Sequence, residues 1–452
     1  MTINEFFKVP LRYDEKGMKK SKTEREQGWA GWCMYDWANS GFATVVLSAV
    51  FPVYFLALVP AGGAQISIFG WSRQVAGPAL WGYVVSLSLL AVALSAPQLG
   101  RLADRRQWRR GLLMFFCLTG ALATSLMVLV GTGQLLLAIV LFSLANFGFA
   151  ASNIFYNAFL PDLGGEDGMD TLSARGFALG YIGGGLCLLV VFVMIQGYQT
   201  LGLADRGMAT RFGLLFTGLW WALFSIPVFR ALKGRTAPTT VTAAATTHTG
   251  YLATFRALRD YQDLLRFLIA FLFYNDGIQT LIVVAAVFAK DELGLSQATI
   301  LGCFLMIQFV AMPGALLFGR LAARIGAQKA IALSLVGFIS VVVYAWFINQ
   351  AWQFWLLGAA VAVVLGGSQS ISRSLYAKLI PAGRNAEFFG FYAISNKFAA
   401  ILGPLVFALL TDITGSTRTS ILALAAFFII GMLLLTRVDV ARGRLAARQA
   451  NP

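Results

Sequence analysis

Charged side chains are scarce in this sequence. They make up 12% of its 452 residues, whereas 58% are hydrophobic, and the mean hydropathy is +0.73. Average soluble domains carry about 25% charged residues, so this chain lacks the polar groups that two or three soluble domains of its length would need. The composition therefore indicates a polytopic membrane protein.

Histidine and cysteine are also scarce. The single histidine, His248, lies in the Thr- and Ala-rich stretch 237–250, which is typical of a flexible linker, so a histidine proton relay inside the membrane is excluded. The cysteines are isolated in different apolar runs, a spacing that indicates neither a disulfide framework nor a metal site. They are Cys33, Cys117, Cys187 and Cys303. We therefore expect no metal and no cofactor.

Apolar runs of the length that crosses a bilayer, about 18 to 25 residues, recur along the chain. They are continuous in Leu, Ala, Val, Phe and Gly, whereas strands of a membrane barrel alternate between apolar and polar residues. The sequence therefore predicts an all-α membrane protein with twelve transmembrane helices. The predicted spans are 29–58, 77–99, 111–131, 134–160, 174–197, 211–231, 263–289, 297–319, 328–348, 352–379, 388–411 and 418–436.

The distribution of lysine and arginine predicts the orientation. Roughly 28 of the 35 fall in the two tails and the even-numbered loops, against about 5 in the odd-numbered loops. Both termini are therefore expected in the cytoplasm, with the chain in a bacterial inner membrane. The net charge of +15 reflects this bias and contact with anionic lipids, not nucleic-acid binding. The acidic loop 161–170 runs against the pattern, but acids orient poorly.

The two halves of the sequence repeat. "GRLADRRQWRR" at 100–110 returns as "GRLAARIGAQK" at 319–329, and "SNIFYNAFLP" at 152–161 matches "SRSLYAKLIP" at 372–381, both about 220 residues further on. We therefore predict two pseudo-symmetric six-helix bundles. The expected segments are an N-terminal tail at 1–28 that is no cleavable signal peptide, bundles at 29–231 and 263–436 joined by a linker at 232–262, and a C-terminal tail at 437–452.

The halves, the linker and the Gly-x-Leu-Ala-Asp-Arg loop resemble the major facilitator superfamily of secondary transporters. The second copy departs from the loop pattern, with Ala323 where the first has Asp104. Longer stretches, among them "YDWANSGFATVV", "RGFALGYIGGG" and "GGSQSISRSLYAKLIP", resemble the branch that contains the fungal autophagy-linked vacuolar amino-acid effluxer and its bacterial relatives. The resemblance implies the major facilitator fold and a gradient-driven transporter of small solutes.

Four charged residues within the predicted spans are candidates for function, because an ionised group there costs at least about 2.5 to 3.5 kcal/mol unless it finds a partner or water. Asp276 and Lys397 lie at similar depth, roughly 20 and 14 Å along their helices, which makes an ion pair plausible. Asp36 and Arg373 lie nearer the predicted cytoplasmic end. There Asp36 could be a helix-end carboxylate and Arg373 could extend to the interface; alternatively, Asp36 faces the pathway and exchanges a proton or a partner such as Arg373. Asp36 and Asp276 are the candidates for proton coupling.

Neutral polar residues surround these charges on spans one, four, seven and ten, which the resemblance places on the substrate cavity. Some are expected to bind substrate and others only to form hydrogen bonds between helices. The candidates are Asn39, Asn153, Tyr156, Asn157, Gln279, Gln369 and Ser370. The nearby aromatic cluster is predicted to be an interfacial belt, with the wall of a cation–π cavity as the alternative. It consists of Trp29, Trp32, Tyr35 and Trp37.

The basic loop after span two and its repeat after span eight have two interpretations. They could serve topology alone, whereas the resemblance implies a cytoplasmic gate that holds helices together through charge and dipole contacts. The gate candidates are Gly100, Asp104, Arg105, Arg109, Arg110, Gly319 and Arg324.

The favoured function is secondary active transport of a small polar or amphipathic solute. The resemblance suggests amino-acid export. The protein is expected to be a monomer whose further partners are membrane lipids and protons. The sequence contains no ATP-binding loop and no catalytic constellation, so we expect no enzyme. A lipid or siderophore transporter of the same fold, a non-transporting receptor and an intramembrane lipid enzyme remain as alternatives.

Overall fold

The architecture is a bundle of long apolar helices, seen in a computed structural model that describes residues 22–68, 71–234, 258–398 and 402–449. Among these residues, ten helices are long and apolar enough to cross a membrane, and a bent pair, Arg25–Ala49 with Phe51–Leu58, adds an eleventh. The predicted span 388–411 corresponds to α15 and α16, which flank residues 399–401 outside the described part. The arrangement agrees with the predicted twelve-helix bundle.

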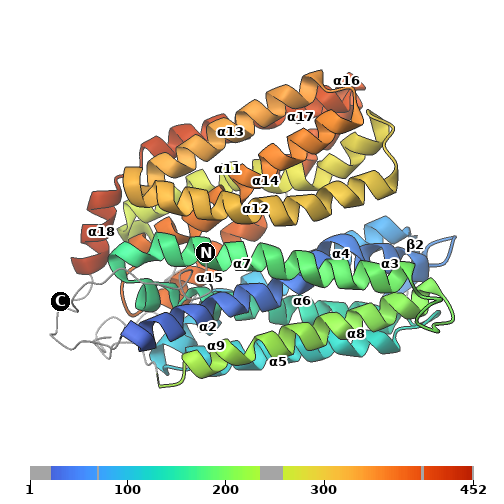
Figure 1. The fold of residues 1–452 in the computed structure, drawn as a ribbon, viewed down its shortest axis with the longest axis horizontal. Coiled ribbons are helices and arrows are strands. Elements are labelled where there is room, and N and C mark those ends of the chain that lie inside the picture. The colour runs from blue at the N-terminus through green and yellow to red at the C-terminus, as the bar shows by residue number, and fades with distance from the viewer. Residues whose placement is uncertain (1–21, 69–70, 235–257, 399–401, 450–452) are drawn as a thin grey trace.

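The N-terminal half (blue to green in Figure 1) is built from α2 to α9. Its elements are α2 (Lys22–Gly41), η1 (Phe42–Ala49), α3 (Phe51–Leu58), β1 (Ala64–Ile68), β2 (Trp71–Val75), α4 (Gly77–Arg105), α5 (Arg109–Leu126), η2 (Met127–Leu129), α6 (Leu135–Asn157), α7 (Leu160–Gln196), α8 (Arg206–Phe224) and α9 (Ile226–Ala231).

The C-terminal half (yellow to red in Figure 1) repeats the plan. Its elements are α11 (Gln262–Asp291), α12 (Gln297–Ile325), α13 (Ala327–Phe347), α14 (Ala351–Leu379), α15 (Asn385–Phe398), α16 (Leu402–Thr414), α17 (Thr417–Thr436) and α18 (Val440–Gln449). We call the end of the bundle at which α2 begins and α18 lies the terminal end; the β-hairpin lies at the opposite end (Figure 1).

Local sequence explains where several helices begin and end. Asp205, Ser296 and Ser416 each precede a helix and accept a hydrogen bond from the backbone N–H three residues later, which satisfies one of the free donors of the first turn. Gly326, with φ of 89°, separates α12 from α13 in a conformation that other residues rarely adopt. Gly165, with φ of 59°, likewise breaks α7 near its start.

The first predicted span, 29–58, differs from a straight helix. Helix already covers residues 22–28, ahead of the predicted boundary, because Lys, Glu, Arg and Gln are good helix formers although hydropathy does not detect them. Its middle, Phe42–Ala49, is a π-helix, and the N–H of Val50 bonds to the carbonyl of Val45. The two parts of the span meet at 44°. A π segment in a helix often marks a functional position.

Two elements were not expected from the sequence. An antiparallel hairpin pairs Ala64 with Val75 and Ile68 with Trp71 in the loop after the first span. The C-terminal tail, predicted at 437–452, contains the helix α18. Hydropathy finds only segments that cross the bilayer, so a short amphipathic helix or hairpin outside it escapes detection.

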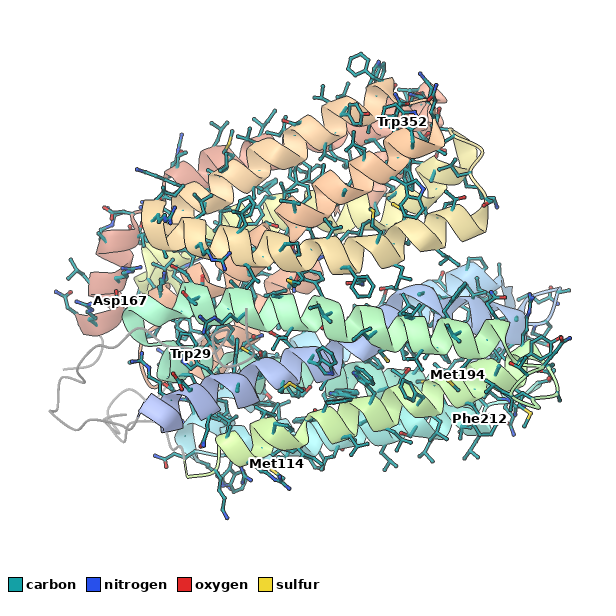
Figure 2. All side chains as sticks on the ribbon, in the orientation of Figure 1. Trp29, Met114, Asp167, Met194, Phe212 and Trp352 are labelled. Atoms are coloured by element: carbon teal, nitrogen blue, oxygen red, sulfur yellow. The ribbon has the colours of Figure 1, made fainter. Side chains whose placement is uncertain are left out.

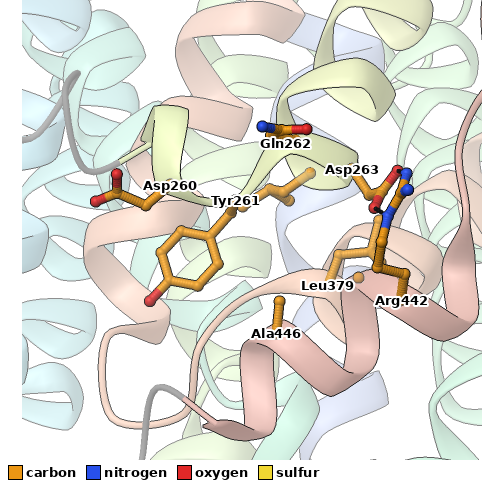
Figure 3. A pocket seen from close by; sticks show the side chains of 9 residues that line it. Asp260, Tyr261, Gln262, Asp263, Leu379, Arg442 and Ala446 are labelled. Carbon is orange, nitrogen blue, oxygen red and sulfur yellow. Dashed lines mark hydrogen bonds and ion pairs between the residues drawn. The ribbon is translucent and has the colours of Figure 1, made fainter.

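Helix α18 docks on the terminal end of the C-terminal half. Arg442 donates to both oxygens of Asp263, at 2.6 and 2.8 Å, and Gly443 lies against Leu379. Beside this contact lies a cleft of about 150 Å³, also lined by Tyr261 (Figure 3). Because this cleft lies between elements of one half, it is not part of the interface between the halves.

The most extensive contacts between the two halves are those of α4 with α15 and of α7 with α12, and α7 also packs against α14. On α4, Arg101 and Asp104 contact α15 at the terminal end. Leu87, Leu90 and Leu94 continue the same helical stripe toward the opposite end, and all three are exposed. The C-terminal half therefore does not cover this part of α4, and the ribbons of the two halves diverge toward that end in Figure 1. Figure 2 places Asp167 and Trp29 at the terminal end and Trp352 at the opposite end.

Glycines allow the closest helix contacts within each half. A Cβ added at Gly148 would lie 2.7 to 2.9 Å from backbone atoms of Phe116 and Gly120 on α5. We predict that Gly148→Val destabilises the protein by about 1 to 3 kcal/mol, because backbone cannot move aside as a flexible side chain can. Thermal unfolding in detergent measures the effect. Gly82→Val is the matched control, since nothing lies within 4 Å of its added Cβ; equal losses for both would refute the packing argument.

Candidate functional site

Polar contacts between the halves gather at the terminal end. Three clusters of charged groups join α2, α4, α6 and α7 of the N-terminal half to α14 and α15 of the C-terminal half. Their charged members are largely buried, so each cluster needs its partners in place.

The deepest cluster centres on Arg373 of α14. Its Nη1 and Nη2 both donate to Asp36 Oδ2 of α2, each at 3.0 Å. Its Nε donates to Ser173 Oγ at 2.8 Å, its Nη2 also to the Ser173 carbonyl at 2.9 Å, and its Nη1 also to Asn157 Oδ1 at 3.4 Å. An arginine has five N–H donors, and here all five have acceptors. Asp36 and Arg373 are only 8% and 4% exposed, so neither reaches the interface as a helix-end or extended charge.

Aromatic rings enclose the same guanidinium group. Its carbon lies 4.2 Å from the ring centroid of Phe177, 4.8 Å from that of Trp32 and 5.7 Å from that of Tyr156. Trp32 and Tyr156 also stack on each other, with centroids 4.4 Å apart. Trp29, Trp32 and Tyr35 are fully buried, so they are not the interfacial belt that the sequence predicted. Trp32 instead has the alternative role, a cation–π wall.

The second cluster joins Asp170 of α7 to α14. Lys378 forms an ion pair with Asp170 Oδ2, and Ser374 Oγ donates to Asp170 Oδ1 at 2.6 Å. The side chains of both Asp170 and Lys378 are less than a tenth exposed. This contact ties the first turns of α7 to the last turn of α14.

The third cluster places Asp104 at the N-terminus of α15. Its carboxylate accepts the backbone N–H groups of Ala386 and Glu387, at 3.2 and 2.9 Å, where a negative charge complements the helix dipole. Arg109 donates to it at 2.7 Å and fixes its orientation. A Cβ at Gly100 would lie 2.3 Å from the Ala386 carbonyl oxygen, so only glycine allows α4 and α15 this close.

Further polar groups surround the start of α15. Glu387 accepts from Arg384 at 2.8 Å and forms an ion pair with Arg101 of α4 at 3.4 Å. Burial alone would lower the pKa of Arg384, but the hydrogen bond and charge of Glu387 raise that pKa above its ordinary value. Asn385 donates to the Ala158 carbonyl and to Asp162 Oδ1, both at 3.2 Å.

The second copy of the loop makes a different contact. A Cβ at Gly319 would lie 2.4 Å from the Cβ of Ala174, so α12 and α7 touch closely, but Ala323 and Arg324 are exposed. In the first copy, Arg105 is also exposed, and Arg110 donates to the Phe229 carbonyl within its own half. Of the predicted gate residues, the structure therefore brings Gly100, Asp104 and Gly319 to the interface, with Arg109 behind Asp104.

Asp276 is buried within the C-terminal half, 1% exposed. Both its oxygens accept the backbone N–H of Gly403, at 3.0 and 2.9 Å, in the first turn of α16. The side chain of Lys397 lies outside the described residues, so the expected ion pair remains a prediction. The described contact of Asp276 is instead with the backbone of α16.

Several of the neutral candidates form hydrogen bonds between helices. Asn39 donates to Asn153 Oδ1 at 3.2 Å within the N-terminal half. Gln369 accepts from Tyr181 at 2.9 Å and the Ser370 carbonyl accepts from Ser173 at 2.6 Å, both across the interface. Gln279 is half-buried on α11.

Sequence reasoning missed several residues of these clusters. Asp170 lies in the acidic loop 161–170, which was considered only as an orientation signal. Lys378 lies in the repeat "SRSLYAKLIP" beside Arg373. An acidic loop and a lysine at the same predicted depth and side could have suggested the pair. Nothing in the sequence indicated Ser173 or Asn385.

A substitution tests the contact at α15. We predict that Asp104→Asn speeds deuterium uptake at the amides of Ala386 and Glu387, because the helix N-terminus loses a negative partner worth about 0.3 to 2 kcal/mol, roughly a 2- to 30-fold change. Hydrogen-exchange mass spectrometry on the full chain in nanodiscs measures it. Arg324→Gln, on the exposed second copy, is the control and should change nothing there. Unchanged uptake in Asp104→Asn would show that the carboxylate does not hold α15.

The chain is similar in fold to several solved structures. The chain superposes on the E. coli fucose:proton symporter FucP with a TM-score of 0.68 at 12% identity, covering 91% of this chain and 98% of that one. A bacterial homologue of the iron transporter ferroportin gives 0.62 at 15% identity, with coverages of 91% and 98%. At such identities the likeness shows the major facilitator fold alone.

Comparison with relatives in sequence identifies the family more specifically. The uncharacterized MFS-type transporter YxiO of Bacillus subtilis is 31% identical over 96% of this chain and 99% of its own length. Autophagy-related protein 22 of Yarrowia lipolytica is 26% identical over 81% of this chain and 76% of its own. The family model described as "Vacuole effluxer Atg22 like" matches residues 23–448. The chain therefore belongs to the Atg22-like branch of the major facilitator superfamily, whose members are transporters and not enzymes.

Proposed function

We propose that the protein is a secondary active transporter that works by alternating access. The observation that carries the proposal is that the polar contacts between the halves lie on one side. Buried ion pairs and hydrogen bonds join the halves at the terminal end, whereas Leu87, Leu90 and Leu94 of α4 are exposed toward the opposite end. Rocking of one half against the other would break the first set and open the terminal side.

The terminal end is proposed to face the cytoplasm of a bacterial cell, with the chain in the inner membrane as a monomer among lipids. The supporting observation is the concentration of lysine and arginine in the loops and tails of that end. In this orientation the conformation described here is open toward the outside.

The substrate is proposed to be a small polar or amphipathic solute, an amino acid or a related metabolite, moved outward. The support is the description of the matching family as vacuole effluxers. Proposed substrate contacts come from the spans that face the interface. They are Asp36, Asn39, Asn153, Tyr156, Asn157, Asp276, Gln279, Gln369, Ser370, Arg373 and Lys397.

Asp36 and Asp276 are the proposed proton-coupling carboxylates. Each is buried, and each is held by a contact that rocking can change: Asp36 by Arg373 of the other half, and Asp276 by the start of α16. Loss of such a partner favours the protonated form of a buried carboxyl group, which is the requirement for coupling.

Transport in proteoliposomes tests the proposal. Uptake and efflux of labelled amino acids are measured with and without an imposed pH gradient, for the unmodified chain, Asp36→Asn and Asp276→Asn. We predict gradient-dependent movement that falls by at least about tenfold in one or both variants, because breaking a buried pair or cap costs more than 1.4 kcal/mol. Asp412→Asn, on the exposed surface of α16, is the control and should transport normally.

Two outcomes would contradict the proposal. If none of the amino acids moves although the protein is folded and both orientations are present, amino-acid transport is wrong. If movement occurs without dependence on the gradient in any variant, proton coupling is wrong.

A further inference from the structure

The groups that surround the Arg373 guanidinium all come from one half of the protein. Arg373 belongs to α14 of the C-terminal half, but every hydrogen-bond acceptor and every ring around its guanidinium group belongs to the N-terminal half. The arginine is thus inserted into a pocket that the N-terminal half builds by itself. We call this the guanidinium pocket. It consists of Trp32 and Asp36 of α2, Tyr156 and Asn157 of α6, and Ser173 and Phe177 of α7.

Close packing shapes the guanidinium pocket. A Cβ at Gly176 would lie 2.5 Å from Asp36 Oδ2, 2.8 Å from the Trp32 ring and 2.9 Å from Arg373 Nη2, so only glycine leaves room for the ion pair there. The N–H of the Trp32 ring is bonded to the Tyr156 carbonyl at 3.1 Å, which fixes two of the three rings relative to each other. These supports all lie within the N-terminal half, so they do not depend on Arg373.

The chemistry of the guanidinium pocket selects cations. Toward Arg373 it presents acceptor atoms: the Asp36 carboxylate, the Ser173 carbonyl and hydroxyl oxygens, and the Asn157 side-chain oxygen. The faces of Trp32, Tyr156 and Phe177 add the negative side of their ring quadrupoles. An anion would be repelled, and a neutral solute would leave a buried carboxylate without a counter-charge.

We propose that the guanidinium pocket binds the cationic group of a transported solute, a guanidinium or primary ammonium, in the state in which the halves part at the terminal end. When α14 moves away with its half, Arg373 leaves, and the Asp36 carboxylate either takes up a proton or needs a new counter-charge, so a cationic solute and a proton compete for it. A solute with a positively charged nitrogen group replaces the arginine, and Arg373 is the tethered occupant that the solute displaces. This inference rests on the proposed alternating access and adds the chemical class of the substrate.

Competition between solute and Arg373 has a conformational consequence. Both cannot occupy the pocket, so a bound cation excludes the closed terminal end and shifts the population toward the open one. Guanidinium solutes should bind better than primary amines, because they match the five-donor pattern that the pocket already satisfies. Neutral solutes of the same shape should bind weakly.

A binding experiment on the full chain in nanodiscs tests the pocket directly. Arg373→Ala removes the tethered occupant. We expect methylguanidinium to raise the melting temperature of this variant at a concentration at least tenfold lower than its neutral isostere methylurea does. The selectivity should disappear in the double variant Asp36→Asn/Arg373→Ala. Phe177→Leu combined with Arg373→Ala should weaken binding severalfold, whereas Phe115→Leu, an exposed phenylalanine on α5, should not.

A second measurement does not need Arg373 to be changed. With Ser374→Cys as reporter, buried at the closed terminal end, agmatine should increase the rate of maleimide labelling severalfold, and putrescine less so. The native cysteines are buried, and their background is measured in the chain without the reporter. Equal effects of cationic and neutral probes in both experiments, or selectivity that survives Asp36→Asn, would overturn the proposal.

The outcomes separate this inference from the proposed function. If proteoliposomes move neutral amino acids but not arginine or agmatine, and the pocket shows no cation selectivity, transport stands and the cationic substrate class is wrong. If the pocket selects cations but no solute moves along a gradient, the pocket stands as a binding site and secondary transport is wrong.

Discussion

Burying charge in an apolar bundle is the constraint on which the contacts between the two halves depend. Asp36, Arg373, Asp170 and Lys378 are buried, and each finds its counter-charge on the other half of the molecule. Removing one member of a buried pair costs about 3 to 5 kcal/mol. These charges are therefore neutralised by one another only when the terminal end is closed. In any open state, water, protons or other ions must replace the lost counter-charges.

The sequence predicted the helices well because a bilayer requires long apolar segments, and hydropathy detects them. It also suggested Arg373 as a partner of Asp36, since both charges lie nearer the predicted cytoplasmic end of their spans. It did not reveal Asp170 with Lys378, the hairpin or α18. Whether two side chains meet depends on how helices cross, and short elements outside the membrane carry no hydropathy signal. The sequence also did not reveal the contact of Asp276 with the Gly403 backbone, because charge pairing suggests side-chain partners and not a backbone N–H group.

Pseudo-symmetry is preserved in the architecture, but the α4–α15 and α7–α12 pairs are held together by different chemical contacts. Where the first loop places Asp104 against the start of α15, the second has Ala323, which is exposed. The α7–α12 pair relies on the close approach of Gly319 to Ala174, and the neighbouring charge contact comes from Asp170 and Lys378. One pair is thus held mainly by a carboxylate at a helix dipole, and the other by small residues beside an ion pair.

The π-helical stretch Phe42–Ala49 has a consequence for the geometry of the first span. Its hydrogen bonds skip one residue further than those of an α-helix, so the side chains after it are turned relative to those before it. A helical wheel drawn straight from Asp36 to Phe55 assigns the second part to the wrong faces. Phe51 and Phe55 after this stretch are fully buried, as are Trp32 and Tyr35 before it. The side chains that follow the stretch therefore take their directions from the altered winding of Phe42–Ala49 and from the 44° bend after it.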